Sequence, residues 1–384
     1  MKVLYIANNV TKHGGGLAKN IMDFCDAIPG HIVSFVQDAN VEPLISSCTE
    51  NIQVYSIPVL KKYYFPSRKN ILRSIEKNWQ DIDLVILNGL FTYSNYWALK
   101  NCKRHKTPMI LVPHGCLEKP AQVHKKLWMR LFINAIIEYA SGVIFACTKE
   151  YQVANNYINS DTLAKKSLIT YWPVSENILS SKHEAKKMLH EQLGIPLKQR
   201  IILYLGRIDA HKRVKKLVHL FHNAQLKNTN LVIVGNIDSK EGKEAIALKE
   251  ALKAKKVFFK NSVWGKEKKV FFQGADAYVS FSKRENFSYS TVEALSYSTP
   301  VILSNGHYII EDLAPAKCGF FIEKDNEIAF MEALYSFEST SDDNLVNMGI
   351  EGEKWVKKSL SKQTFRTNIE SFIKQTLLLS AKDK

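Results

Sequence analysis

Short apolar runs rich in β-branched residues recur along the chain and alternate with segments of helical spacing. In the first half these runs cover residues 3–7, 32–36, 52–57, 84–87, 109–112, 143–146 and 168–171. In the second half they cover residues 201–205, 231–234, 257–259, 277–281, 301–303 and 319–322. Strands that alternate with helices are typical of a largely parallel sheet covered on both faces. The pattern therefore predicts an α/β protein made of two doubly wound lobes in series.

A proline-containing segment and a polar helical run mark the junction between the predicted lobes. The segment 171–175 reads Tyr-Trp-Pro-Val-Ser, where Pro173 interrupts regular structure, and the polar run follows from Ser181 to Leu193. We therefore expect an N-terminal domain over residues 1–173 and a C-terminal domain over residues 174–364. Residues 365–384 form an amphipathic helix that we expect to return to the N-terminal domain. Its apolar stripe consists of Phe365, Ile369, Phe372, Ile373 and Leu377.

Length and composition agree with two packed lobes. The 384 residues are too many for one ordinary core, and 46% hydrophobic with 23% charged residues is a folded, globular composition. No secretory signal and no long apolar span is recognisable, so we expect a cytoplasmic protein. The six cysteines are scattered without CxxC or CxxH spacing, which argues against a zinc site or a disulfide framework.

Charge adds a preference for anionic partners. The chain has 53 Lys and Arg against 37 Asp and Glu, a net charge of +16. A surface of this charge attracts phosphate, whether in nucleic acid, in anionic lipid or in a phosphorylated small molecule. Charge alone does not choose among these three partners.

Candidate chemistry lies where the predicted strands end, because ligands of parallel sheets bind beyond the carboxyl ends of the strands. In the first half, Gly14, Gly15 and Gly16 precede a predicted helix, and glycines there let an anion approach the backbone. Their spacing fits neither GxGxxG nor a P-loop, and a plain surface turn is the alternative. His114 beside Gly115 could donate to a sugar hydroxyl or a phosphate, although a single histidine is often structural.

Two cations and two carboxylates follow strand ends in the second half. Gly206 is followed by Arg207 and Lys212, a pair that could stabilise the charge of a diphosphate leaving group; a solvated basic helix start is the alternative. Glu285 and Glu293 stand eight residues apart across a strand-to-helix turn, so both could face one ligand. Glutamates at helix starts are also common caps, which leaves this segment open on chemistry alone.

Together these segments resemble the retaining glycosyltransferase family 4, which has the GT-B architecture. The resemblance is carried by Gly206-Arg207 with Lys212, by Glu285-Asn286-Phe287 with Glu293-Ala294, and by residues 299–302 (Thr-Pro-Val-Ile) in order and spacing. Residues 14–16 and 113–118 look like the matching N-terminal half, and the latter is similar to members that build bacterial surface polysaccharides. The resemblance implies two Rossmann-like domains facing a central cleft.

The resemblance also implies an activity. Such an enzyme transfers a sugar from a nucleotide diphosphate donor, a UDP-sugar or GDP-sugar, to a hydroxyl of a glycan or lipid-linked acceptor, and it keeps the anomeric configuration. The departing phosphate helps to deprotonate the acceptor on the same face, and no metal or other cofactor is required.

The resemblance gives each candidate residue a role. Arg207 and Lys212 would hold the donor phosphates, Glu293 the ribose hydroxyls and Glu285 the hydroxyls of the donor sugar. Backbone N–H groups around Phe287, Ser288 and Tyr289 would complete the phosphate cradle, with Gly235 near the base. His114 would contact donor sugar or phosphate, while Gly15 and Gly16 would face the reacting centre.

Two features depart from these patterns. Asn286 and Ser288 stand where the family commonly has glycine; asparagine tolerates left-handed backbone and serine is small, so the turn can survive with an altered donor pocket. Asp81-Ile82-Asp83 has the DxD form of a metal site, but it opens a predicted strand, at the end of a parallel sheet opposite to the ligands.

Cations interleave with aromatic residues in two segments of the first half. These are residues 61–69 (Lys-Lys-Tyr-Tyr-Phe-Pro-Ser-Arg-Lys), leading to Ile71, and residues 125–132 (Lys-Lys-Leu-Trp-Met-Arg-Leu-Phe). The mixture suits contact with an anionic membrane surface and also single-stranded nucleic acid; ordinary amphipathic helices are the alternative. By analogy with the family we favour peripheral contact with the inner face of the plasma membrane over nucleic acid.

The leading hypothesis is thus a retaining glycosyltransferase of bacterial surface glycan assembly, acting in capsule, O-antigen or lipopolysaccharide synthesis. A nucleotide-sugar epimerase or a sugar phosphorylase of the same architecture is one alternative. A non-catalytic nucleic-acid-binding module is another. Acceptor-dependent release of nucleoside diphosphate would separate the transferase from the epimerase.

Overall fold

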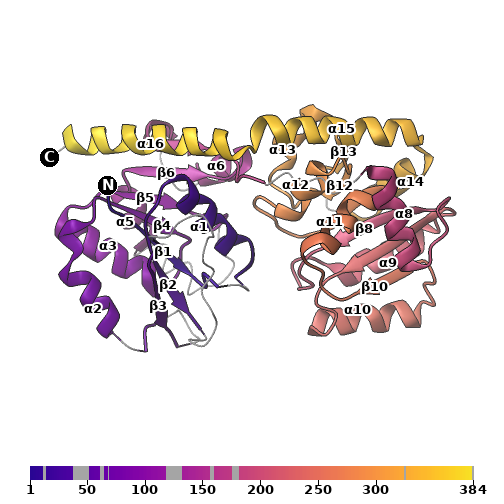
Figure 1. Cartoon of the computed structure of the whole chain (residues 1–384), viewed down its shortest axis with the longest axis horizontal. Helices are drawn as coiled ribbons and strands as arrows, with labels where there is room; N and C mark the ends of the chain where they lie inside the picture. The colour runs from indigo at the N-terminus through magenta and orange to yellow at the C-terminus, as the bar shows by residue number, and fades with distance from the viewer. Residues whose placement is uncertain are drawn as a thin grey trace. The chain divides into compact units, whose positions relative to one another are not determined.

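The computed structural model describes residues 1–11, 14–37, 52–60, 65–67, 69–117, 132–155, 160–174, 181–323 and 326–382. It divides the chain into two compact units: unit 1 is Met1–Pro173 with Lys362–Lys384, and unit 2 is Val174–Ser361. Each unit contains one parallel sheet packed against helices (Figure 1). The predicted α/β class is confirmed, and every apolar run predicted as a strand overlaps one.

Unit 1 has a seven-stranded sheet with the order β3-β2-β1-β4-β5-β6-β7, in which all neighbours are parallel. Its strands are β1 (Val3–Asn8), β2 (His31–Val36), β3 (Val54–Pro58), β4 (Leu84–Asn88), β5 (Met109–Val112), β6 (Gly142–Phe145) and β7 (Ser167–Ile169). Its helices are α1 (Gly15–Ala27), α2 (Asn70–Lys77), α3 (Tyr93–His105), α5 (Asn134–Tyr139), α6 (Thr148–Ala154), α7 (Ser160–Lys166) and α16 (Lys362–Lys382), with the short 3₁₀ turn η1 (Trp79–Asp81).

Unit 2 has a six-stranded parallel sheet with the order β10-β9-β8-β11-β12-β13. Its strands are β8 (Arg200–Leu205), β9 (Thr229–Val234), β10 (Val257–Lys260), β11 (Ala277–Ser280), β12 (Val301–Ser304) and β13 (Gly319–Ile322). Its helices are α8 (Lys182–Leu193), α9 (Val214–Ala224), α10 (Lys240–Ala251), α11 (Gly265–Gly274), α12 (Tyr289–Ser296), α13 (Ile310–Leu313), α14 (Glu327–Ser339) and α15 (Asp342–Ser359), with the 3₁₀ turn η3 (Ala314–Ala316).

Both sheets reverse their strand order beside the first strand of the unit. In unit 1 this strand is β1, between β2 and β4, and in unit 2 it is β8, between β9 and β11. The loops that leave the carboxyl ends on either side of the reversal diverge, which opens room for a ligand at that edge. The topology therefore fixes where each unit can bind a ligand.

The last helix, α16, belongs to unit 1 and is held there by aromatic contacts. The Phe365 ring lies 5.2 Å from Phe24 of α1 and 6.1 Å from Trp172, measured between centroids. Farther along, Phe372 packs where a Cβ on Gly142 would lie 2.9 Å from its ring. Among the described helices, none has both the length and the hydropathy needed to cross a membrane.

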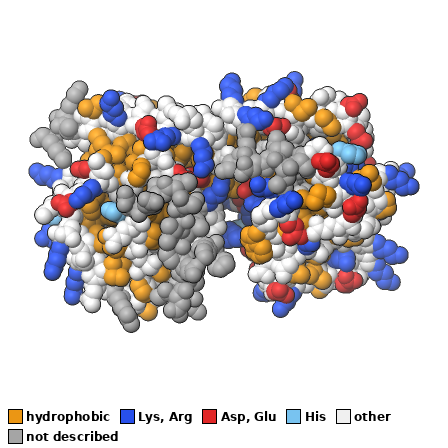
Figure 2. Space-filling view, viewed as in Figure 1, with side chains coloured by type: hydrophobic (Ala, Val, Ile, Leu, Met, Phe, Trp, Pro, Cys, Tyr) orange, Lys and Arg blue, Asp and Glu red, His pale blue; other side chains and the backbone are white. Residues whose placement is uncertain are grey.

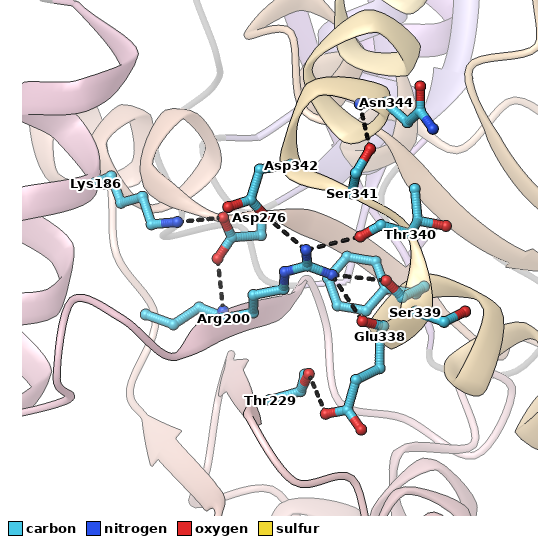
Figure 3. A network of polar contacts seen from close by, with 12 residues as sticks. Lys186, Arg200, Thr229, Asp276, Glu338, Ser339, Thr340, Ser341, Asp342 and Asn344 are labelled. Atoms are coloured by element: carbon cyan, nitrogen blue, oxygen red, sulfur yellow. Dashed lines mark hydrogen bonds and ion pairs between the residues drawn. The ribbon is translucent and has the colours of Figure 1, made fainter.

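At the amino ends of the unit 2 strands, Arg200 joins the start of β8 to the end of α14 (Figure 3). Its guanidinium donates to the carbonyl oxygens of Phe337 at 2.8 Å and Thr340 at 2.7 Å, and it pairs with Asp342 at 2.6 Å. The last carbonyls of a helix lack partners within the helix, so this cation satisfies them and complements the helix dipole. The stabilising network thus lies at the edge of the sheet opposite to the ligand edge.

We expect Arg200→Met to lower the free energy of unfolding of unit 2 by about 2–3 kcal/mol, because several carbonyls and a carboxylate lose a charged donor. Urea denaturation followed by circular dichroism measures this change. Lys215→Met is the matched control, since the Lys215 pair with Glu244 is 57% and 44% exposed and such pairs contribute little. Equal effects of the two substitutions would contradict the role given to Arg200.

Candidate active site

Four loops of unit 2 meet at the carboxyl edge of its sheet, after the neighbouring strands β9, β8, β11 and β12. After β9, a Cβ added to Gly235 would lie 2.3 Å from the carbonyl oxygen of Gly206, which follows β8. The Lys283 amide donates to the His211 carbonyl at 2.8 Å and ties the loop after β11 to the loop after β8. These backbone contacts bring the predicted site residues of this half to one edge.

Lys212 and Glu285 form an ion pair at this edge. The Lys212 ammonium donates to Glu285 Oε1, and the two side chains are 17% and 15% exposed. The resemblance implies separate roles for them, one at the donor phosphate and one at the donor sugar, and the structure places them in contact. An ammonium next to a carboxylate offers donors for phosphate oxygens and an acceptor for sugar hydroxyls side by side.

Glu293 on α12 is held by a lysine that the sequence did not single out. Lys268 on α11 donates to both carboxylate oxygens of Glu293 at 2.9 Å, and its ammonium lies 5.6 Å from the centre of the Phe272 ring. Glu293 is 19% exposed, so the carboxylate still reaches solvent. Lys268 stands in a run of helical charges, and nothing in its spacing sets it apart from its neighbours.

Arg207 lies on the same loop as Lys212 but points outward. Its side chain is 81% exposed and pairs with Asp209 at 3.6 Å. Its backbone is fixed, because the Tyr204 hydroxyl donates to the Arg207 carbonyl at 2.6 Å. The structure therefore fixes the position of Arg207 while leaving its guanidinium accessible to a ligand.

In the turn before α12, Ser288 occupies a position whose backbone conformation favours glycine. Ser288 has φ of 57°, in the left-handed region that favours glycine, and its hydroxyl is 2.8 Å from that of Thr291. Phe287 is buried and its ring lies 5.3 Å from that of Tyr289, edge to face, so Phe287 can contribute only its backbone to a ligand. Asn286 is not among the described residues with positive φ. The turn survives with serine at its one left-handed position.

In unit 1, His114 stands at the end of β5 with a defined environment. Its φ is 51°, its Nε2 lies 3.1 Å from Asn88 Oδ1 at the end of β4, and its ring lies 5.8 Å from that of Trp172. With the Asn88 oxygen facing it, Nε2 carries the hydrogen and Nδ1 is the acceptor. Burial lowers the pKa of His114 to about 4, so the imidazole is neutral at physiological pH.

A buried carboxylate that sequence reasoning missed holds the His114 loop. Glu150 in the first turn of α6 is 2% exposed. It accepts from the Gly115 amide through Oε1 and from the Ala146 amide at 2.8 Å through Oε2. Glu150 thereby ties the loop after β5 to the loop after β6. The residues it joins are 35 and four positions away in sequence, so spacing alone does not reveal the contact.

The predicted glycines lie at the start of α1. A Cβ on Gly14 would lie 2.1 Å from the Asn9 carbonyl oxygen, and Gly15 has φ of 66°. Gly15 and Gly16 are exposed and α1 has no acidic residue in its first turn. Backbone N–H groups at this helix end are therefore accessible to an anion.

Four aromatic rings of unit 1 form a row that includes two tyrosines at the start of α3. Successive centroids are 5.4 Å apart for Phe65 and Tyr93, 6.2 Å for Tyr93 and Tyr96, and 5.8 Å for Tyr96 and Phe132. Four cations are exposed nearby: Lys69 just before α2, Arg73 on α2, and Lys100 and Arg104 on α3. Figure 2 shows Lys and Arg side chains along the rim of unit 1 where Figure 1 places α2 and α3. We call these four cations with the four rings the α2–α3 face.

Parts of two predicted segments lie outside the described residues. These are residues 61–64 and 68 of the first basic aromatic segment and residues 125–131 of the second, including Lys61, Lys62, Lys125 and Lys126. Asp81 and Asp83 of the DxD sequence are described and lie at the amino end of β4. Lys2 contacts both, with Nζ 3.3 Å from Asp81 and its amide 2.7 Å from Asp83.

Residues 185–355, a little under half of the chain, match the family described as Glycosyl transferases group 1. Two curated relatives are each 26% identical to this chain: an uncharacterized glycosyltransferase of Methanocaldococcus jannaschii over 144 residues, and the alpha-monoglucosyldiacylglycerol synthase of Streptococcus pneumoniae over 161 residues. These matches cover 37% and 40% of this chain and only 37% and 35% of the relatives. The matches support a glycosyltransferase.

Solved structures resemble the whole chain. Sucrose-phosphate synthase from Thermosynechococcus elongatus has a TM-score of 0.78 at 17% identity and covers 99% of this chain and 100% of its own. Anabaena HepE in complex with UDP and glucose also has a TM-score of 0.78, at 14% identity, and the match covers 97% of this chain and 99% of HepE. The lipopolysaccharide outer core galactosyltransferase WaaB has a TM-score of 0.70, at 17% identity, and the match covers 98% of this chain and 99% of WaaB. At these identities the likeness establishes the fold, which confirms the predicted GT-B architecture.

We expect Glu150→Gln to lower the free energy of unfolding of unit 1 by about 1–3 kcal/mol, because an amide NH₂ would face one of two buried N–H donors. Urea denaturation measures the loss, and hydrogen exchange of the Gly115 amide should accelerate. Glu138→Gln is the matched control on the exposed side of α5. An unchanged exchange rate at Gly115 would show that Glu150 does not hold this loop.

Proposed function

We propose that the protein is a retaining, metal-independent glycosyltransferase that uses a nucleotide diphosphate sugar. The observation that carries the proposal is the Lys212–Glu285 ion pair at the ligand edge of a unit that matches a glycosyltransferase family. The pair supplies in one place a cation for the donor phosphates and a carboxylate for the hydroxyls of the donor sugar.

Around this pair, the donor would be held by residues of neighbouring loops. Glu293, kept in place by Lys268, accepts hydrogen bonds from the ribose hydroxyls, and Gly235 lies near the base. The exposed Arg207 guanidinium swings onto the diphosphate, and backbone N–H groups of 287–289 complete its cradle. HepE was solved with UDP and with glucose, which supports a UDP-sugar as the first donor to test.

In the proposed reaction the bond between the sugar C1 and the diphosphate oxygen breaks. The acceptor oxygen forms its bond to C1 on the same face, and the acceptor proton goes to the departing phosphate. Lys212 and Arg207 stabilise the charge that develops on the diphosphate. On unit 1, the Nδ1 acceptor of the neutral His114 suits a sugar hydroxyl, and the exposed Gly15 and Gly16 offer backbone N–H groups to an anion.

For the acceptor we propose a glycan or lipid-linked hydroxyl of a bacterial surface polysaccharide. Support comes from the names of similar proteins, one a glycolipid synthase and one a lipopolysaccharide galactosyltransferase. We also propose that the α2–α3 face contacts the anionic inner face of the plasma membrane. Tyr96 and Phe65 are 39% and 45% exposed beside the cations of this face, a combination that suits a headgroup region.

Transfer is tested by acceptor-dependent release of nucleoside diphosphate, after a thermal-shift screen of UDP-sugars and GDP-sugars has identified the donor. We expect Lys212→Ala to lower kcat by about a hundredfold, because charge on the leaving group loses its donor.

Glu293→Ala should weaken the binding of UDP or GDP in calorimetry by about 1–3 kcal/mol through lost ribose contacts.

Lys215→Ala is the control for both measurements, since Lys215 is an exposed lysine three residues from Lys212. A Lys212→Ala enzyme with near-normal rates would remove Lys212 from the mechanism. Consumption of the nucleotide sugar without an acceptor would favour an epimerase, and consumption that depends on inorganic phosphate would favour a phosphorylase.

Membrane contact is tested by sedimentation with vesicles of phosphatidylglycerol and phosphatidylcholine. Replacing Lys69, Arg73, Lys100 and Arg104 together by Glu should reduce binding at least tenfold, since each cation near an anionic surface contributes about 1 kcal/mol. Activity on a soluble acceptor should be retained. The matched control replaces Lys240, Lys243, Lys253 and Lys255 of unit 2, which are equally exposed, and changes the net charge by the same amount. Equal losses in the two variants would indicate attraction by net charge and not a docking face.

A further inference from the structure

A buried histidine lies behind Glu285 on the loop after β12. His307 is 2% exposed, and both of its ring nitrogens have partners. Nδ1 lies 2.9 Å from the Ser304 carbonyl oxygen and Nε2 lies 2.9 Å from the Ser280 hydroxyl. A carbonyl oxygen only accepts, so Nδ1 carries the hydrogen and Nε2 accepts from Ser280. The imidazole thus joins the end of β12 to the end of β11.

The backbone on either side of His307 holds Glu285. The Glu285 amide donates to the Gly306 carbonyl at 2.7 Å, and the Tyr308 amide donates to the Glu285 carbonyl at 2.9 Å. The two bonds form an isolated parallel bridge between Glu285 and His307, outside the main sheet. We call this pair of bonds the Glu285 bridge. It fixes the backbone of the residue whose carboxylate meets Lys212.

Close packing leaves this bridge little freedom. A Cβ on Gly306 would lie 2.3 Å from the Ser282 carbonyl oxygen, and the Ser304 hydroxyl donates to the same carbonyl at 2.8 Å. The Ser282 and Ser280 hydroxyls are 3.0 Å apart. His307 is therefore part of a hydrogen-bonded network that joins both strand ends.

We propose that His307 is a positioning residue for the Glu285 carboxylate, and that it acts by fixing the Glu285 bridge against Ser280 and Ser304. The proposal rests on the proposed function, in which Glu285 orients the donor sugar. Burial also lowers the pKa of His307 to about 4, so the imidazole keeps this neutral pattern of one donor and one acceptor near neutral pH. Misplacing a substrate-orienting group by about 1 Å can cost about a hundredfold in rate.

The first test compares His307→Leu with His307→Gln. Leucine removes both hydrogen bonds at similar volume, whereas glutamine can still accept from the Ser280 hydroxyl. We expect His307→Leu to lower kcat about 10- to 100-fold while the Kd for UDP changes less than about twofold. We expect His307→Gln to recover most of the rate. A Kd for UDP that weakens in parallel with kcat would point to general damage of unit 2 and would overturn the positioning role.

A double-mutant cycle then shows whether the effect passes through Glu285. In a Glu285→Gln background, His307→Leu should lower the remaining rate by less than about twofold, because residues that act through one another are not additive. If His307→Leu lowers the rate by the same factor in both backgrounds, it does not act through Glu285, and the proposal is wrong.

Hydrogen exchange of the free protein separates this proposal from the proposed function, since it needs no substrate. In His307→Leu, and in Ser280→Ala as a milder second variant, exchange of the Glu285 and Tyr308 amides should accelerate at least tenfold. Exchange of the Ile233 amide in β9 serves as the control for global stability. Unchanged exchange at Glu285 would overturn the proposal even in an active enzyme. If the wild-type protein transfers no sugar, the proposed function fails, while accelerated exchange would still show that His307 fixes the bridge.

Discussion

At the ligand edges of both sheets, glycines pack directly against backbone carbonyl groups, and the rest of the candidate site depends on this close approach. A Cβ would lie 2.3 Å from a carbonyl oxygen at Gly235 and at Gly306, and 2.1 Å from one at Gly14. No side chain fits at such distances, so only glycine lets these loops converge. The convergence fixes the loop after β8 next to the loop after β9, and the loop after β12 next to the loop after β11. Lys212 and Glu285 can form their pair because the loops that carry them are already in place.

Polar side chains buried behind the ligand edges use their hydrogen bonds to hold neighbouring loops together. Both carboxylate oxygens of Glu150 accept from amides of two neighbouring loops. Both ring nitrogens of His307 bond to groups at two neighbouring strand ends, a carbonyl and a hydroxyl. A buried polar group without partners would cost several kcal/mol, so each such contact has a strong preference for one geometry. The two units therefore solve the same problem with different chemistry, a carboxylate in unit 1 and a neutral imidazole in unit 2.

The sequence predicted the fold well because apolar β-branched runs are a local signal. Every predicted strand is present, and the loops holding Lys212, Glu285 and His114 follow strand ends as expected. The sequence links left-handed backbone to Asn286 and small size to Ser288, whereas the positive φ falls on Ser288 and not on Asn286. The sequence did not predict which side chains contact one another. Lys268 reaches Glu293 across 25 residues and His307 reaches Ser280 across 27, and such contacts depend on the strand order of the sheet and not on spacing.

The ion pairs at the edge of unit 2 also bear on how a dianionic ligand can bind there. Lys212 and Lys268 each contact a carboxylate, so each ammonium at this edge is held in an ion pair. A half-buried cation without a partner would lose hydration with nothing to compensate, whereas a paired cation is held in one position before the ligand arrives. In the proposed function, a diphosphate would meet at Lys212 a donor whose position is already fixed, while Glu285 would keep its second oxygen for a hydroxyl. Fixing charges in advance reduces the reorganisation that a reaction must wait for, which is the main source of electrostatic catalysis. In the proposed function, the paired carboxylates are thus as much a part of donor binding as the lysines they hold.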